Sequence, residues 1–167
     1  MRHVVVNDAS SLIDLRKGGL LPALGNLPYR LVVPLPVRES EILDFSDAQW
    51  QTLEDAGLIT YDLTPDEVGQ ALALKALHPA LSANDCFCFV TANIRDGILV
   101  TGDRQLRNVA ADNGLRVHGV LWILDELHAA HACSVCTSAR ALRTWQSDVT
   151  VFLPRDEIAK RLDHLLR

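Results

Sequence analysis

The chain has 167 residues, of which 49% are hydrophobic and 22% are charged, and its formal net charge is −5. This composition is typical of a globular protein with a sizeable core, and no apolar stretch approaches the ~20 residues that a membrane span requires. Proteins that bind nucleic acid through their overall charge are usually basic, so such a function would need a local site here. The N-terminus has no signal-peptide pattern and the four cysteines indicate no disulfide framework, so we expect a cytoplasmic protein without a membrane segment.

Short apolar runs alternate with helical patterns along the chain. The runs predict strands at residues 3–7, 30–33, 58–62, 97–101 and 116–121. Their lack of strict alternation is typical of strands that are covered on both faces. Capping patterns predict helix starts near residues 46, 64 and 82, and the chain from about residue 122 is expected to be helical throughout.

This order of elements indicates an α/β protein with a parallel sheet and right-handed crossovers. No repeat, low-complexity segment or linker divides the chain. We therefore expect one domain over residues 1–167, with a core at about 3–127 and a helical extension at about 128–167.

Two aspartates follow predicted strands at the point where a helix begins. Asp8 comes after Val4-Val5-Val6, and Asp103 comes after the segment ILVTG. In an open parallel sheet, ligands collect at the carboxyl ends of the strands. If the two strands are adjacent, these carboxylates meet at one crevice. Aspartate is also a favoured helix N-cap residue, and capping alone would explain either position.

Further acids are candidates for the same crevice. Asp85 begins the helix that leads into the strand before Asp103, although as the third residue after Ser82 it could simply close a capping box. Glu39 and Glu41 are expected on a helix after the second strand. Residues two apart on a helix point in different directions, so only one of the glutamates should reach the crevice. The sequence leaves open which one does.

Five segments of the chain, in this order, resemble the PIN-domain family of metal-dependent ribonucleases, which includes the VapC-like toxins of toxin–antitoxin systems. The segments are VVVNDASSLIDL, PVRESEIL, LSANDCFCFVTA, ILVTGDRQLRNVA and VHGVLWILDEL, and they cover about residues 3–127. The resemblance implies a three-layer α/β/α fold with a central parallel sheet of four or five strands, to which this chain adds C-terminal helices. It also implies a Mg²⁺ or Mn²⁺ site formed by Asp8, Asp85, Asp103 and a glutamate. The family glutamate is expected where this chain has Ser40, which leaves the register of that acid open.

A cluster of carboxylates creates a repulsion that a cation relieves. Each like charge raises the pKa of its neighbour and destabilises the fold. Hard oxygen ligands suit Mg²⁺ or Mn²⁺ and not Zn²⁺, and such an ion can activate water for phosphodiester hydrolysis. We expect Asp8 and Asp103 to bind the metal, and Asp85, also a candidate ligand, to complete the site or orient the attacking water together with Glu39 or Glu41.

Polar neighbours of these acids are assigned supporting roles. Candidates for hydrogen bonds to the metal-binding carboxylates are Asn7, Ser10, Asn84 and Thr101. Local backbone capping is the alternative for these side chains. Contacts to RNA phosphates are expected from Arg38, Arg95, Arg104 and Arg107. Any one of these arginines could instead be an ordinary solvated surface residue.

The sequence therefore predicts a Mg²⁺- or Mn²⁺-dependent endoribonuclease. The resemblance implies the toxin of a toxin–antitoxin pair, a cognate antitoxin protein as partner, and a homodimer. The alternative is a non-catalytic module that binds a protein. Leu162, Leu165 and Leu166 could serve an interface, although core packing is the preferred interpretation of that apolar face.

The segment HAAHACSVC is a weaker candidate for a metal site. His128, His131, Cys133 and Cys136 could in principle hold zinc, but all four fall within one short segment. Closed zinc sites usually draw ligand pairs from separate segments. We therefore expect a helix end, a turn and a second helix with partly buried cysteines.

Overall fold

Strands and helices alternate along the chain, which a computed structural model describes over residues 2–42 and 44–167. Leu43, the last residue of the segment PVRESEIL, lies outside the described residues. The strands are β1 (His3–Asn7), β2 (Tyr29–Pro34), β3 (Ile59–Tyr61), β4 (Ile98–Val100) and β5 (Arg116–His118). The helices are α1 (Ala9–Lys17), the 3₁₀ helix η1 (Leu21–Asn26), α2 (Leu35–Ser40), α3 (Asp47–Asp55), α4 (Pro65–Leu77), α5 (Ala83–Ile94), α6 (Arg104–Asp112), α7 (Val120–Ala129), α8 (Val135–Ser147) and α9 (Arg155–Leu165).

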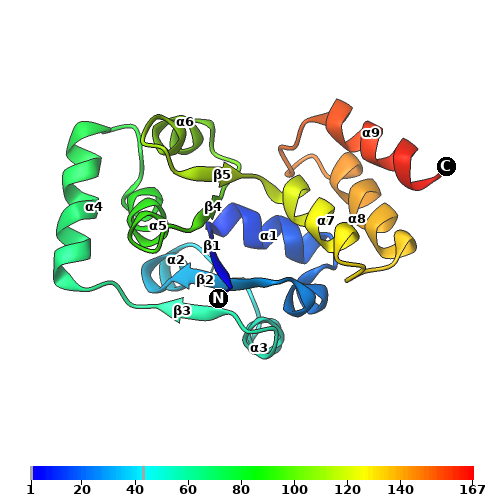
Figure 1. Ribbon diagram of the computed structural model, residues 1–167, viewed down its shortest axis with the longest axis horizontal. Helices are drawn as coiled ribbons and strands as arrows, with labels where there is room; N and C mark the ends of the chain where they lie inside the picture. The colour runs from blue at the N-terminus through cyan, green and yellow to red at the C-terminus, as the bar shows by residue number, and fades with distance from the viewer. Residues whose placement is uncertain (1, 43) are drawn as a thin grey trace.

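The described strands form one parallel sheet in the order β3-β2-β1-β4-β5. The central strand β1 pairs Val5 with Leu31 of β2 and with Ile98 of β4. Helix α5 packs on one face of the sheet with α4 outside it, while α1 and α7 cover the other face and α8 and α9 lie beyond them (Figure 1). The three-layer α/β/α fold expected from the sequence is thereby confirmed.

The sheet is buried on both faces. Val5, Val6, Leu99 and Val100 of the two central strands have no exposed surface. Leu12 of α1 and Cys86 of α5 are equally buried, so both helical layers contribute to the core. Burial on both faces explains why these strands are continuous apolar runs without alternation.

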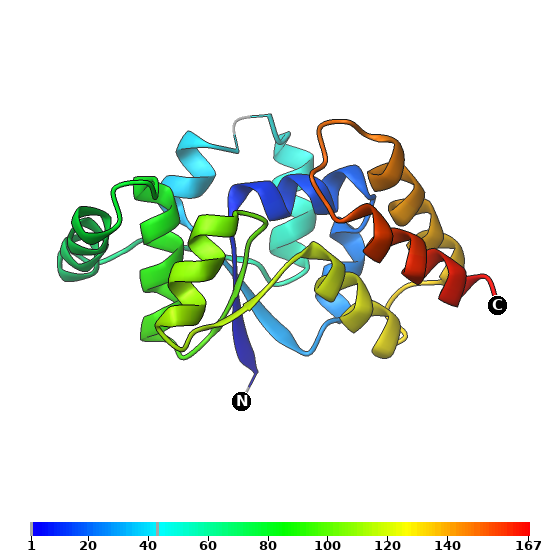
Figure 2. The same ribbon diagram turned by 90° about the horizontal axis from the view of Figure 1, so that it is seen from above.

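Helix α8 packs against α1 through a glycine. Gly18 ends α1, and a Cβ at this position would lie 2.9 Å from Cζ2 of Trp145. Trp145 is 1% exposed, and its Nε1 donates a hydrogen bond to the main-chain carbonyl of Asp14 at 2.7 Å. In Figure 2, α8 and α9 lie together at the end of the molecule that carries the C-terminus. The close approach at Gly18 thus fixes α8, and with it α9, to the core.

The structure corrects the prediction of a strand over residues 116–121. The strand β5 ends at His118, and Gly119 is the N-cap of α7. Val120, Ile123 and Leu127 of α7 are buried at helical spacing. A short apolar run is compatible with a strand or with a buried helix, and here the helix period prevails.

Two further predictions of helix boundaries are wrong. The C-terminal part is not helical throughout, because non-helical segments at 130–134 and 148–154 separate α7, α8 and α9. Glu41 does not lie within a helix, because α2 ends at Ser40 and Glu41 is its C-cap, with φ −116°. Within the residues that the structure describes, no helix is both long and apolar enough to cross a membrane.

Candidate active site

The carboxyl ends of β1 and β4 lie side by side, and each leads into a helix that an aspartate caps. Asn7 is paired with Val100, so Asp8 and Asp103 follow the strands at the same edge of the sheet. Oδ1 of Asp8 accepts a hydrogen bond from the backbone N–H of Ser11 at 2.8 Å, and Oδ1 of Asp103 accepts one from Leu106 at 2.8 Å. Both aspartates are therefore N-caps, and both also lie where a parallel sheet binds ligands.

Four acidic side chains line one cavity of about 200 Å³ at this edge: Asp8, Glu41, Asp85 and Asp103. Asp8 follows β1 and Glu41 is the C-cap of α2. Asp85 lies in the first turn of α5, and Asp103 is the N-cap of α6. The other residues lining this acidic cavity are Ala9, Ser10, Val37, Asn84 and Cys88. Segments that are far apart in the sequence thus contribute carboxylates to a single cavity.

Asp8 is the most enclosed of the four acids, with 8% of its surface exposed. Its Oδ1 also accepts a hydrogen bond from the hydroxyl of Ser10 at 3.1 Å, and its Oδ2 accepts one from the hydroxyl of Thr101. Burial raises the pKa of Asp8 above its ordinary value, and the hydrogen bonds oppose that rise. A cation next to Asp8 would favour its ionised form and offset the cost of burial.

Asp85 and Asp103 each commit one carboxylate oxygen to a helix cap. Oδ2 of Asp85 accepts a hydrogen bond from the backbone N–H of Ser82 at 2.9 Å, and the hydroxyl of Ser82 accepts one from the N–H of Asp85 at 3.0 Å. Within the described part of the chain, the second oxygen of each aspartate has no hydrogen-bond partner. Capping therefore orients these side chains and leaves an oxygen for a ligand.

Glu41, and not Glu39, lines the cavity. Oε1 of Glu41 accepts a hydrogen bond from Nδ2 of Asn84 at 2.5 Å, and the same amide donates to the hydroxyl of Ser40 at 2.9 Å. Glu39 is exposed. The end of α2 at Ser40 allows the backbone to turn Glu41 toward α5, which helical geometry would not predict.

The acids of this cavity carry negative charge that no neighbouring basic side chain of the described residues pairs with. Among residues 2–42 and 44–167, none of its four acids forms an ion pair. In the same part of the chain, no three His, Cys, Asp or Glu side chains come close enough together to hold a metal ion. The side chains of the four acids would therefore have to converge to share one ion. Their donors are oxygens, which suit a hard divalent cation.

The thiol of Cys88 also lines the cavity. Burial, and then the neighbouring carboxylates, raise the pKa of Cys88 well above its ordinary value, so the thiol remains protonated. A metal ligand must be a thiolate, so the cavity offers oxygen ligands and no anionic sulfur.

The supporting polar residues are divided between this cavity and other places. Ser10 and Thr101 donate to Asp8, and Asn84 donates to Glu41. Asn7 is buried, and its Nδ2 donates to the carbonyl of Val5 at 3.3 Å instead.

Two of the four arginines predicted to contact RNA are held by other side chains. Arg38 forms an ion pair with Glu54 at 2.8 Å, and its guanidinium lies 4.1 Å from the ring centroid of Trp50. Arg95 follows α5, at the opposite edge of the sheet, and lies 3.7 Å from the ring centroid of Tyr61.

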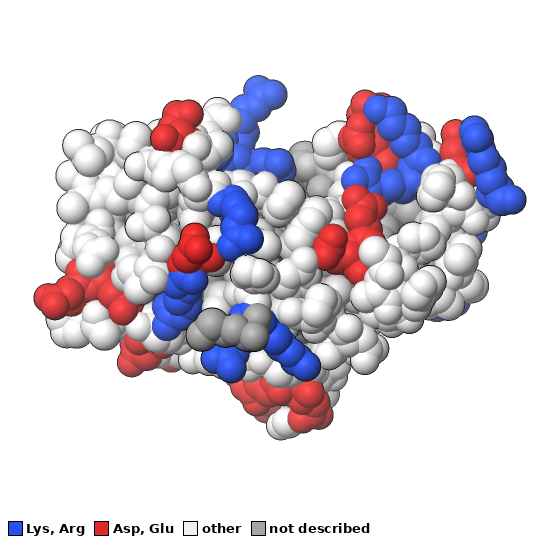
Figure 3. Space-filling view, viewed as in Figure 1, with Lys and Arg blue, Asp and Glu red and all other residues white. Residues whose placement is uncertain are grey.

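That opposite edge of the sheet carries basic side chains. Arg2, Arg30 and Arg95 line a cavity of about 900 Å³ at the amino ends of the strands. Figure 3 shows this face, where Lys and Arg side chains surround the start of β1. Arg95 therefore lies away from the acidic cavity, at the opposite edge of the sheet.

Arg104 and Arg107 lie next to the acidic cavity. They line another cavity, of about 740 Å³, which shares Ser10 and Asp103 with the acidic cavity. We call this cavity the arginine groove; Asp14, Arg104, Arg107 and Phe152 line it outside the shared residues. Two of the predicted arginines thus adjoin the acids.

Asp14 is an acid at this site that the sequence analysis did not identify. Burial raises its pKa to about 6, Lys17 opposes the rise, and the charges of Asp8 and Asp148 add to it. Raised acid pKa values are typical of functional sites. The spacing of Ser10 and Asp14 on α1 is the signal that could have revealed it, because residues four apart share one helix face.

The HAAHACSVC segment has the expected helix end, turn and second helix, but only one of its two cysteines is partly buried. Helix α7 ends at Ala129, and α8 begins at Val135 after Ser134 caps it. Cys133 is partly buried, 3.1 Å from the hydroxyl of Ser138, and Cys136 is exposed. Over the described residues these side chains form no group that could hold a metal ion.

Comparison with known families agrees with this geometry. A family model described as a PIN domain matches residues 4–165 of the chain. The chain therefore belongs to the PIN-domain family, as the resemblance predicted, and the match includes α8 and α9. No curated protein matches the chain significantly. Family membership indicates a nuclease in general, with the nucleic-acid binding and divalent metal use that are typical of PIN nucleases.

Proposed function

We propose that the chain is a Mg²⁺- or Mn²⁺-dependent endoribonuclease that hydrolyses RNA phosphodiester bonds. One observation carries the proposal: Asp8, Glu41, Asp85 and Asp103 line a single cavity at the carboxyl edge of the sheet. In the described part of the chain no ion pair compensates them. Uncompensated carboxylates at such a site attract a divalent cation, which in turn attracts phosphate.

The proposed roles follow from the contacts of each side chain. Asp8, Asp85 and Asp103 would hold the metal, and Glu41 would complete the site or orient the attacking water. A metal held by these residues would supply an activated water and neutralise charge on the reacting phosphate. Ser10 and Thr101 hold the carboxylate of Asp8 in place, and Asn84 holds that of Glu41. Glu39 has no role in this proposal.

RNA cleavage by the purified chain tests the proposal. Incubation with RNA should yield cleavage in Mg²⁺ or Mn²⁺ and none in EDTA. Asp8→Asn and Asp103→Asn should lower the rate at least about a hundredfold, since each removes an oxygen ligand, yet asparagine still caps a helix. Glu41→Gln should also slow cleavage, whereas Glu39→Gln and the exposed Asp112→Asn should not. Full activity in Asp8→Asn would refute the assignment.

We further propose that the protein is the toxin of a type II toxin–antitoxin system and acts in the cytoplasm. The resemblance to VapC-like proteins supports this role, and free ribonuclease activity would require a cognate antitoxin, commonly bound to a homodimer of the toxin. Induced expression should arrest growth, Asp8→Asn should relieve the arrest, and a neighbouring small gene should encode a DNA-binding protein. Growth unaffected by the wild-type chain would contradict this role.

A non-catalytic module that binds a protein is the second candidate. One observation favours it: within residues 2–42 and 44–167, no three potential ligands are close enough to hold a metal. On that alternative, the wild-type chain cleaves no RNA in any divalent ion, and Asp8→Asn is indistinguishable from it.

A further inference from the structure

We infer that the arginine groove binds a nucleotide of single-stranded RNA that flanks the scissile phosphate, with Phe152 stacking on its base and Arg104 and Arg107 contacting its phosphate. This inference rests on the proposed nuclease function of the acidic cavity. The groove and that cavity share Ser10 and Asp103, so a strand whose phosphate lies at the acids continues into the groove.

The guanidinium groups of the two arginines in the groove are available to a ligand. Among the described residues, neither Arg104 nor Arg107 forms an ion pair. Arg38, Arg95 and Arg161, in contrast, are each held by an acid or an aromatic ring. The guanidinium of Arg107 lies next to Gly119: a Cβ at position 119 would be 3.1 Å from Nη1 of Arg107. Guanidinium groups without a protein partner, next to a phosphate site, suit phosphate contacts.

Phe152 presents an aromatic ring to the same groove. It is 89% exposed, although its neighbour Val151 is 6% exposed and anchors the segment between α8 and α9. Lys17 donates a hydrogen bond to the hydroxyl of Thr150 at 2.6 Å, and Asp148 accepts one from the N–H of Thr150 at 2.8 Å. The ring is thus held outward by a packed segment, which is the arrangement that a base-stacking platform requires.

Stacking selects single-stranded RNA as the ligand. A base can cover an aromatic ring only when it is not stacked within a duplex, and proteins recognise unpaired RNA in this way. Asp14 of α1 repels phosphate at one side of the groove, so the phosphate should lie on the side of α6, near Arg104 and Arg107.

Binding to a labelled RNA tests the inference separately from cleavage. The protein is the full chain with Asp8→Asn in Mg²⁺, and the probe is a fluorescein-labelled pyrimidine decamer, single-stranded or annealed to its complement, followed by anisotropy. The single strand should bind more tightly than the duplex. Phe152→Ala should weaken its binding about 5- to 150-fold, as expected for loss of one base stack. Phe152→Trp should restore affinity, and Val149→Ala, an exposed residue of the same segment outside the groove lining, should leave it unchanged.

The arginines should act through salt dependence. Arg104→Gln or Arg107→Gln should reduce the slope of log affinity against log salt by about 0.7 each, the value for one phosphate contact on a single strand.

Each outcome decides between the inference and the proposed function. Unchanged single-strand affinity in Phe152→Ala, or no binding by the parent, overturns the inference. Cleavage by the wild-type chain together with unchanged affinity leaves the nuclease proposal intact. Stacking-dependent binding without metal-dependent cleavage supports the inference as an RNA site and refutes the nuclease.

Discussion

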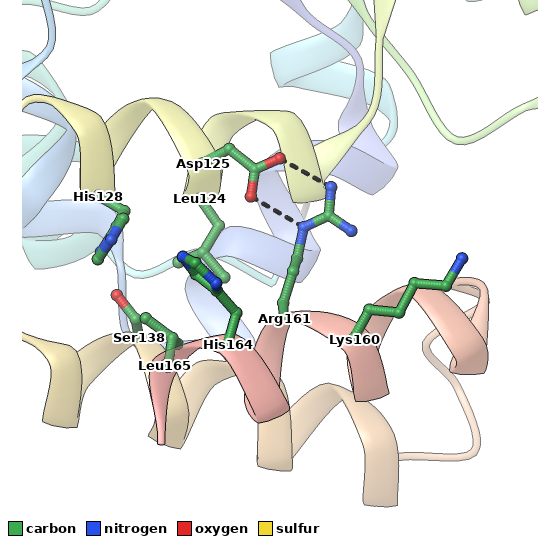
Figure 4. Close-up of a pocket in the computed structure, with 8 residues that line it drawn as sticks. All are labelled: Leu124, Asp125, His128, Ser138, Lys160, Arg161, His164 and Leu165. Atoms are coloured by element: carbon green, nitrogen blue, oxygen red, sulfur yellow. Dashed lines mark hydrogen bonds and ion pairs between the residues drawn. The ribbon is translucent and has the colours of Figure 1, made fainter. Parts of the chain in front are cut away.

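Acidic side chains cluster in two regions of the molecule. Among the described residues, basic side chains pair with them in one region and not in the other. Between α7, α8 and α9, Arg161 donates to both carboxylate oxygens of Asp125, at 2.8 and 2.7 Å (Figure 4). Arg161 also donates to Glu157 at 3.0 Å. Lys160 pairs with Glu157 at 2.9 Å. At the carboxyl edge of the sheet, Asp8, Glu41, Asp85 and Asp103 meet only hydroxyl, amide and backbone N–H groups within the described residues.

The two groups of acids differ in whether basic side chains neutralise their charge. The cavity beside Arg161 is about 260 Å³ and is also lined by Leu124 and Leu165, so its ion pairs join helices around an apolar centre. At the sheet edge, hydrogen bonds orient the carboxylates but do not neutralise them. On the nuclease proposal a divalent cation would neutralise them, whereas the C-terminal acids are paired with Arg161 and Lys160.

The largest expected effect concerns divalent ions. Mn²⁺ at about 100 times its dissociation constant should raise the free energy of unfolding by about 2.7 kcal/mol, and the melting temperature by roughly 5 to 10 °C. Asp8→Asn should remove most of this shift, and Asp125→Asn should keep it. Thermal melts in Mn²⁺ and in EDTA measure both. A shift that survives in Asp8→Asn would show that the ion binds elsewhere.

The next effect comes from loosening the C-terminal region without altering the acidic cavity. Gly18→Ala should destabilise the fold by about 1 to 3 kcal/mol, because its Cβ would overlap Trp145 of α8. Gly69→Ala is the matched control: it lies exposed on α4 with open space around it, and alanine should stabilise the helix by about 0.5 to 1 kcal/mol. Chemical denaturation measures both changes, and the Mn²⁺ shift should persist in each. Equal stabilities for the two variants would contradict this account of helix packing.

A smaller effect links Asp14 to pH. Its pKa is about 6 in the fold, against 3.8 for the unperturbed group, so its ionisation destabilises the fold as pH rises from about 4 to above 6. Asp14→Asn should therefore increase stability above pH 6, by about 1 kcal/mol after allowance for solvent screening, and should give no gain at pH 4. Melts of both proteins across this range measure the difference. A gain that is independent of pH would show that the carboxylate charge is not its cause.

The smallest effect tests the paired acids. Arg161→Met should keep the packing of the side-chain stem but lose its ion pairs, at a cost of about 0.5 to 1 kcal/mol. High salt should reduce the difference from the wild-type chain, because salt screens exposed charges. Cleavage and the Mn²⁺ shift should be unchanged; a loss of either would connect the two regions functionally.

Local patterns predicted much of this molecule correctly. Every predicted strand exists, because buried parallel strands require continuous apolar runs that the chain displays. Capping predicted the starts of α3, α4 and α5, since a side-chain oxygen must satisfy the first free N–H groups of a helix. The prediction of a strand to residue 121 was wrong, because α7 begins after Gly119. The prediction of a continuous helical C-terminal part was also wrong, because non-helical segments separate the last three helices.

The sequence by itself determined the fold class and the positions of Asp8, Asp85 and Asp103 at helix starts, because capping and apolar runs are properties of neighbouring residues. Only the tertiary structure decided that Glu41 and not Glu39 lines the cavity, that Arg38 and Arg95 are held elsewhere, and that Asp14 and Phe152 adjoin the acids. Those outcomes depend on where a helix ends and on which segments pack together across the molecule. Such contacts join residues that are distant in the chain, and no local pattern encodes them.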